Sequence, residues 1–249
     1  MPNMQYTDIT FILDRSGSMS DRRDETINGF NTFIEEQKKE PGRAVVSLIQ
    51  FDDKYTSYET ADALAFSGVD ISQVPKLTRE KFVPRGSTAL RMAICRAIDE
   101  TGKRLADMPE HTRPGKVLFV IMTDGLENAS HLAGPSYGPE QTKGRITHQQ
   151  NVYSWNFMYI GTNQDAVLAA NSFGINAGNT MNYGQSKEEC SSAFTAMSAG
   201  VKSYRGKMDT ARDFGIAADA VRLSDDSSLK TMNAHLSAAP AESETTKQV

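Results

Sequence analysis

Four apolar runs of strand length constrain the fold of this chain more than any other feature. They lie at residues 9–13, 44–51, 116–122 and 155–160. Their length, hydrophobicity and β-branched content are typical of strands buried on both faces of a sheet. Between the runs, apolar residues such as Ile27, Phe30 and Ile34 recur at helical spacing. Strands that alternate with helices predict an α/β, Rossmann-like fold with a doubly wound, mostly parallel sheet and helices on both faces.

The remaining elements follow from turn signals and weaker patterns. Ser20 and Asp21 are candidate caps for the first helix. Residues 55–60 alternate in polarity and predict one antiparallel edge strand, whereas residues 61–87 predict an irregular loop. We further expect a helix of about ten residues before the run at 155–160. Two helices at 166–173 and 187–204, with a short strand at 181–183 between them, complete the prediction.

The composition fits one α/β domain, which we place at residues 1–223. The chain has 249 residues, 39% of them hydrophobic, and a net charge of −4, which gives no reason to expect nucleic acid as a partner. Cys95 and Cys190 fall in helical patterns and are expected to be free, buried thiols. No apolar run approaches the roughly 20 residues of a membrane helix, and no leader precedes the first strand, so we expect a cytoplasmic protein. Residues 224–249 predict a flexible tail.

Small oxygen-bearing side chains cluster where the predicted strands end. Asp14, Ser16 and Ser18 follow the first run in ITFILDRSGSM, Thr88 lies in the RGSTAL loop, and Asp124 follows the run at 116–122 in MTDG. Each alone is also typical of a turn or a helix cap. Because parallel strands bring their carboxyl ends to one edge, we expect the five residues to meet there. Oxygen-only ligands favour Mg²⁺, Mn²⁺ or Ca²⁺.

The chain resembles von Willebrand factor A-type domains over about residues 6–205. In that family the metal-ion-dependent adhesion site has the same three parts in the same order: D-x-S-x-S after the first strand, a threonine before a mid-chain helix, and an aspartate in T-D-G. The resemblance implies that Ser16, Ser18 and Thr88 bind the metal through their hydroxyls. Asp14 and Asp124 would act directly or through bound water.

The resemblance also implies a function. Neutral hydroxyl ligands leave a divalent cation under-neutralised, so that it attracts an Asp or Glu carboxylate from a protein partner. The expected function is therefore a cation-dependent protein-interaction module of a small bacterial or phage type, not an enzyme. Intracellular relatives often act beside ATPases of the AAA type, and this chain lacks the phosphate-binding G-x-x-x-x-G-K-[ST] loop of such a motor.

Two other functions remain open from the sequence. Haloacid-dehalogenase-type phosphatases also place an aspartate and Mg²⁺ after a first central strand, but they need a second aspartate where this chain has Ser16. A structural role in a phage virion is the other alternative, and virion association would then replace the cytoplasmic location.

Other polar residues near this edge have simpler expected roles. Asp52 and Asp53 predict a solvated turn, and Arg22 and Arg23 a solvated helix start. Glu127 and Asn128 are candidates for the rim of the site, and Gln164 and Asp165 for a helix cap. The histidines show no zinc-like spacing and are expected on the surface: His111, His131, His148 and His235.

Overall fold

The structure, a computed structural model, describes residues 1–162, 166–184 and 186–213, with side chains as far as residue 206. The strands are β1 (Asn3–Asp14), β2 (Arg43–Phe51), β3 (Tyr55–Thr56), β4 (Phe66–Asp70), β5 (Pro114–Thr123), β6 (Asn156–Thr162) and β7 (Thr180–Tyr183). The α-helices are α1 (Arg23–Gln37), α2 (Leu90–Ala106), α3 (Pro139–Tyr153), α4 (Ala166–Ser172) and α5 (Lys187–Asp213).

The strands form one sheet in the order β3-β2-β1-β5-β6-β7, with β4 also paired to β2. β1 is central and parallel to both neighbours, so that Ile9 lies opposite Val46 on one side and Leu118 on the other. The β5–β6 and β6–β7 pairs are parallel as well. This confirms the predicted α/β fold with a mostly parallel sheet.

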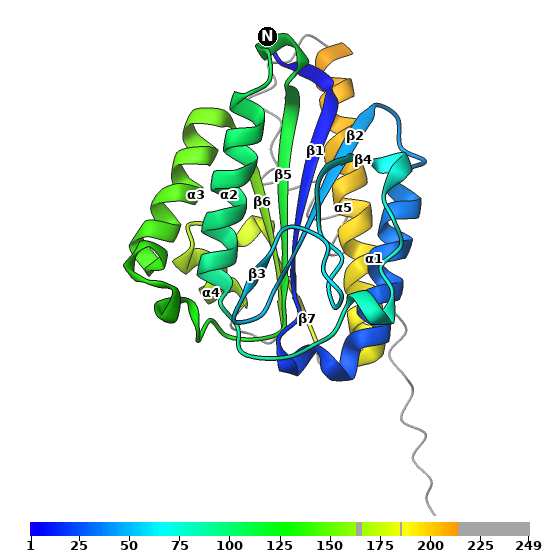
Figure 1. Cartoon of the computed structure of the whole chain (residues 1–249). Coiled ribbons are helices and arrows are strands. Elements are labelled where there is room, and N and C mark those ends of the chain that lie inside the picture. The colour runs from blue at the N-terminus through cyan, green and yellow to red at the C-terminus, as the bar shows by residue number, and fades with distance from the viewer. Residues whose placement is uncertain (163–165, 185, 214–249) are drawn as a thin grey trace, which may run out of the picture.

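Helices cover both faces of the sheet, with α1 and α5 on one face and α2 and α3 on the other (Figure 1). Alternate residues of β1 face these two layers, as the pleat of a strand requires. Phe11 packs against the rings of Phe30 and Phe33 of α1, with centroids 5.4 and 5.7 Å away. Its neighbour Ile12 belongs to the other core, together with Leu90 and other residues of α2. The carboxyl half of β1 is thereby packed against helices on both faces.

The antiparallel edge beside β2 differs from the prediction. The strand expected at residues 55–60 is confined to Tyr55 and Thr56, and a further antiparallel strand, β4, lies within the segment predicted to be an irregular loop. The FSGVD sequence of β4 has no continuous apolar run, and Gly68 adopts φ +62°. Its backbone pairing with β2 depends on the position of β2, so a local pattern could not predict it.

Three helices also differ from their predicted bounds. α1 begins at Arg23, after a 3₁₀ turn at Gly17–Arg22, and no side chain caps it, so the predicted caps Ser20 and Asp21 were wrong. α3 has 15 residues instead of about ten. The prediction was too short because only Thr142 and Ile146 of this helix are buried, so its apolar pattern is weak. α5 continues to Asp213.

The predictions on the cysteines and on membrane helices can be compared with the structure, and the prediction on the C-terminal tail cannot. Cys95 and Cys190 are buried free thiols, as predicted. Among the described residues, no helix combines the length and hydrophobicity needed to cross a membrane. The predicted tail at 224–249 lies outside the described residues, and the domain boundary at residue 223 stays a prediction.

Candidate functional site at the carboxyl edge of the sheet

The carboxyl edge of the sheet brings together the polar residues of three separate segments. β1 ends at Asp14 and continues into the 3₁₀ turn that carries Ser18. β5, which is parallel to β1, ends at Thr123, directly before Asp124. The loop before α2 supplies Thr88, which is buried. The convergence expected from the sequence is therefore present in the fold.

Asp14 is fully buried, and both oxygens of its carboxylate accept hydrogen bonds. The backbone N–H of Ser16 donates to Oδ1 at 2.6 Å, and the hydroxyl of Thr123 donates to Oδ2 at 2.6 Å. Burial raises the pKa of Asp14 to about 6, against the opposing effect of these hydrogen bonds. Asp14 therefore orients the turn that carries the serines and ties it to the end of β5.

Ser16, Ser18 and Asp124 form a hydrogen-bonded chain. The hydroxyl oxygens of Ser16 and Ser18 lie 3.1 Å apart, and the Ser18 hydroxyl donates to Oδ1 of Asp124 at 2.6 Å. Burial raises the pKa of Asp124, while the Ser18 hydrogen bond and the positive charge of Arg22 oppose that effect. The first and third parts of the motif are thus in direct contact.

Thr88 also lies close to this chain of hydrogen bonds, beside Gly125. A Cβ on Gly125 would stand 3.0 Å from Oγ1 of Thr88 and 3.7 Å from Oγ of Ser18, so both hydroxyls lie beside this glycine and a larger residue would crowd Thr88. The side chain of Asn128 accepts a hydrogen bond from the backbone N–H of Thr88 at 2.9 Å, and the N–H of Asn128 donates back to the Thr88 carbonyl at 3.0 Å. The position of Thr88 is therefore set by the loop that follows Asp124.

Arg22 belongs to the site, and its predicted role as a solvated residue was wrong. It ends the 3₁₀ turn at Gly17–Arg22 and is 8% exposed. Its guanidinium donates to Oδ2 of Asp124, the oxygen that Ser18 leaves available. Arg23 is half-buried and donates to the Phe82 carbonyl at 2.8 Å. Sequence reasoning missed both because acidic neighbours suggested a solvated helix start.

The predicted solvated turn at Asp52 was also wrong, because Asp52 is completely buried between two arginines. Its carboxylate lies 3.2 Å from Nη2 of Arg15 and 2.9 Å from Nε of Arg85. Asp62 completes a four-member network, at 3.3 Å from Arg15 and 2.6 Å from Arg85. Asp53, by contrast, is exposed, as predicted.

This network clamps the two loops that supply hydroxyls. Arg15 lies between Asp14 and Ser16 in the first loop, whereas Arg85 begins the loop that ends at Thr88. Backbone hydrogen bonds join the same loops, from Arg85 N–H to the Arg15 carbonyl at 2.8 Å and from Gly17 N–H to the Gly86 carbonyl at 3.2 Å. An arginine inside the D-x-S-x-S turn, with an unexplained aspartate after β2, was the sequence signal for this clamp.

The other candidates have structural roles or lie outside the description. Glu127 accepts hydrogen bonds from the backbone N–H groups of Arg91, Ala129 and Ser130, and so fixes the start of α2 against the loop after β5. Gln164 and Asp165 lie outside the described residues. Three of the histidines, His111, His131 and His148, are exposed as predicted, and His235 is not described.

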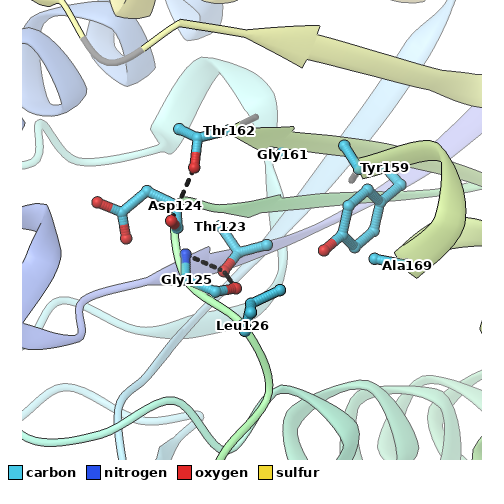
Figure 2. Close-up of a pocket in the computed structure, with 9 residues that line it drawn as sticks. Thr123, Asp124, Gly125, Leu126, Tyr159, Gly161, Thr162 and Ala169 are labelled. Atoms are coloured by element: carbon cyan, nitrogen blue, oxygen red, sulfur yellow. Dashed lines mark hydrogen bonds between the residues drawn. The ribbon is translucent and has the colours of Figure 1, made fainter. Parts of the chain in front are cut away.

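A small pocket of about 60 Å³ lies beside Asp124, between the ends of β5 and β6 and helix α4. Thr162 donates to the backbone carbonyl of Asp124 at 2.7 Å and fixes one wall. Figure 2 shows that the Asp124 carboxylate points away from the side of the pocket where Tyr159 lies. Burial, and to a smaller extent the Asp14 charge, raise the pKa of Tyr159, so its hydroxyl stays neutral.

The donor set decides which cation would suit this edge. No group of three or more His, Cys, Asp or Glu side chains suited to a metal ion occurs within the described ranges. A cation here would therefore depend on hydroxyl oxygens, supported by Asp14 and Asp124. Such oxygen ligands fit Mg²⁺, Mn²⁺ or Ca²⁺ and do not fit the nitrogen and sulfur preferences of zinc. The hydroxyls of Thr88 and Ser18, which come from two separate segments, both lie beside Gly125, so these oxygens are close enough to a common point to serve as such ligands.

Comparison with known proteins finds similar solved structures but no similar sequences. No family model matches the sequence, and no curated protein matches it. Among solved structures, it is similar to the PilB minor pilin from Streptococcus sanguinis (12% identity, TM-score 0.53, 79% of this chain and 61% of that one). It is also similar to a von Willebrand factor type A protein from Catenulispora acidiphila (14%, 0.47, 79% and 42%). A third is the manganese-loaded TRAP protein of Plasmodium vivax (14%, 0.43, 73% and 70%).

These identities are low, so the similarity concerns the fold alone. The chain spans about half to three fifths of the length of the first structures that it matches. The activities and partners of those longer proteins therefore do not transfer to this chain without evidence from its own site.

Proposed function

We propose that this chain is a protein-interaction module that binds a divalent cation at a metal-ion-dependent adhesion site and uses it to capture a partner's carboxylate. Ser16, Ser18 and Thr88 would hold the cation through their hydroxyls, and Asp14 and Asp124 would act directly or through water. Mg²⁺ is the expected ion, with Mn²⁺ or Ca²⁺ as alternatives. The observation that carries the proposal is that Ser18 donates to Asp124 while the hydroxyls of Ser18 and Thr88 both lie beside Gly125.

The charges explain why a carboxylate would be the partner ligand. The three hydroxyls are neutral, and Asp14 uses both of its oxygens to hold Ser16 and Thr123. The cation would supply positive charge that this ligand set neutralises only in part. Ser18 is exposed, so a partner's Asp or Glu can approach the site from solvent. Charge-assisted binding of this carboxylate would make the interaction dependent on the metal.

The phosphotransfer alternative receives less support from the site. A nucleophilic aspartate needs a free oxygen, and Asp14 is completely buried with both oxygens occupied. Ser16 also stands where such enzymes need their second aspartate. These two features favour a binding protein over an enzyme. From the family resemblance we further propose that it is of the small bacterial or phage type and is accessory to an AAA-type ATPase or to an assembly such as a phage virion.

Thermal unfolding with and without metal tests the proposal. If Mg²⁺ binds the folded protein and not the unfolded chain, a free Mg²⁺ concentration 100-fold above Kd stabilises the fold by about 2.7 kcal/mol, which raises Tm by roughly 5 to 11 °C. Ser18→Ala and Thr88→Ala should lose most of this increase. Thr195→Ala removes an exposed threonine hydroxyl on α5 and should keep it. Equal melting curves in Mg²⁺, Mn²⁺, Ca²⁺ and EDTA for the parent protein would refute the metal site.

A pull-down from host lysate, with and without EDTA, tests the interaction itself. Partners whose binding depends on the cation should be captured by the parent protein in Mg²⁺ and lost in EDTA and with Thr88→Ala. The same partners retained in EDTA would argue against carboxylate capture by a metal. Hydrolysis of a generic phosphomonoester that is lost in Asp14→Asn would favour the enzyme alternative.

A further inference from the structure

The Arg22–Asp124 ion pair places a positive charge of the protein itself at the proposed cation site. The guanidinium of Arg22 donates to Oδ2 of Asp124, and the hydroxyl of Ser18 donates to Oδ1 at 2.6 Å. Both carboxylate oxygens therefore have partners in the structure. Side-chain exposure is only 9% for Arg22 and 1% for Asp124, so the pair is weakly screened by solvent.

The position of this guanidinium is built into the turn that also carries the serines. Ser18 and Arg22 lie four residues apart in the 3₁₀ turn at Gly17–Arg22. The turn is held by hydrogen bonds from the Ser20 hydroxyl to the Gly17 carbonyl at 2.7 Å and from Met19 N–H to the Ser16 carbonyl at 3.0 Å. Met19 is completely buried and anchors it to the core. Arg22 therefore approaches Asp124 from a fixed backbone.

Two cations held beside one carboxylate repel each other. A buried aspartate without any positive partner is strongly unfavourable, so Asp124 benefits from Arg22 when no metal is bound. A divalent ion that interacts with Asp124 would offer a larger charge at a similar distance, and the nearby guanidinium would then repel it. The two cations thus oppose each other at one carboxylate.

We propose that Arg22 is the resident counter-cation of Asp124, which stabilises the metal-free site and lowers its affinity for a divalent ion. This inference rests on the proposed function. Metal binding would move the guanidinium away from Oδ2, and Arg22 would thereby set the cation concentration at which the module becomes competent for its partner. Arg22 would influence the metal indirectly, through its ion pair with the Asp124 carboxylate.

Calorimetric titration with Mg²⁺ and Mn²⁺ at pH 7.5 tests the competition. Arg22→Met removes the charge and should tighten binding at least tenfold, while lowering Tm in EDTA because Asp124 loses the positive charge of Arg22 and keeps only neutral partners such as Ser18. Arg22→Lys keeps the charge and should stay within about threefold of the parent Kd. Arg23→Met removes the same charge one residue along, from an arginine that contacts the Phe82 carbonyl, and should not tighten binding.

Each result has a distinct meaning. If the parent binds metal and Arg22→Met binds equally or more weakly, the competition is refuted while the proposed function stands. If only Arg22→Met binds, the competition is supported, and the proposed function of the native chain is refuted. If neither binds, both are refuted.

The parent protein alone provides a second test, should Arg22→Met fail to fold. Crystal structures in EDTA and in Mn²⁺ should show the Arg22–Asp124 hydrogen bond in the first and its loss in the second. An unchanged hydrogen bond beside a bound Mn²⁺ would refute the competition. In that event the ion and the guanidinium would share Asp124, and Arg22 would be purely structural.

Discussion

Removal of Asp52 should destabilise the protein far more than removal of an exposed acidic residue. Asp52 is completely buried, contacts Arg15 at 3.2 Å and Arg85 at 2.9 Å, and accepts the backbone N–H of Lys54 at 2.7 Å. Asp52→Ala leaves the guanidinium of Arg15, which is 1% exposed, with only Asp62 as an acidic partner in the network. Breaking a buried ion pair in this way costs about 3 to 5 kcal/mol.

The matched control is Asp99→Ala, which breaks an exposed ion pair. Asp99 lies 3.3 Å from Arg145, and its side chain is 57% exposed. Exposed pairs contribute about 0 to 1 kcal/mol. For a domain of this size, 1 kcal/mol corresponds to roughly 2 to 4 °C. Asp52→Ala should therefore lower Tm by about 6 to 20 °C, and Asp99→Ala by less than about 4 °C.

Thermal unfolding followed by circular dichroism in EDTA measures this difference without any contribution from metal. Asp52→Ala should also weaken Mg²⁺ binding, because the clamp between the loops of Ser16 and Thr88 is lost. A Tm decrease no larger than that of Asp99→Ala would show that the buried network stabilises the protein no more than an exposed ion pair does, and would refute its role as a clamp.

Three further predictions concern protonation, backbone and core. The pKa of Asp14 is about 6 in the folded protein against 3.8 in the unfolded chain, so protonation of Asp14 stabilises the fold fully below pH 3.8 and no longer above pH 6. Urea unfolding in EDTA should therefore show the free energy of unfolding of Asp14→Asn rising by about 1 kcal/mol relative to the parent between pH 5 and pH 7.5. A difference that stays constant over this range would contradict the prediction. Gly86→Ala, at φ +67°, should cost about 1 to 3 kcal/mol by denaturant titration, whereas Gly144→Ala, inside α3 with open space, should be neutral or stabilising. Phe11→Ala should cost about 3 to 5 kcal/mol by the same titration, and a loss below 1 would contradict its central packing.

The sheet and the site motif were predictable because their signals are local. Long apolar runs such as that of β5 specify buried strands whatever surrounds them. Asp14, Thr88 and Asp124 follow such runs or precede a helix, so the parallel sheet brings them to one edge. β4 was missed because it is held by backbone pairing to β2, and α3 was too short in the prediction because it buries little.

The charged residues show where sequence reasoning stops. Arg15, Arg22 and Asp52 look like surface residues, and acidic and basic side chains are seldom buried without a partner. Their partners come from distant segments: Asp124 for Arg22 is 102 residues away, and Arg85 for Asp52 is 33 residues away. Only the folded chain reveals which charges pair. The Asp52 network and the Arg22–Asp124 pair are therefore recognised only in the folded structure.

The most direct test of the central claim is anomalous diffraction from crystals of the parent protein grown or soaked in Mn²⁺. The proposal predicts an anomalous peak at the manganese edge within about 2.0 to 2.4 Å of the hydroxyls of Ser16 and Ser18, on the side facing Thr88 and Asp124. The peak should be absent from isomorphous crystals of Thr88→Ala. A Mn²⁺-saturated crystal with no peak at this edge of the sheet would contradict the account.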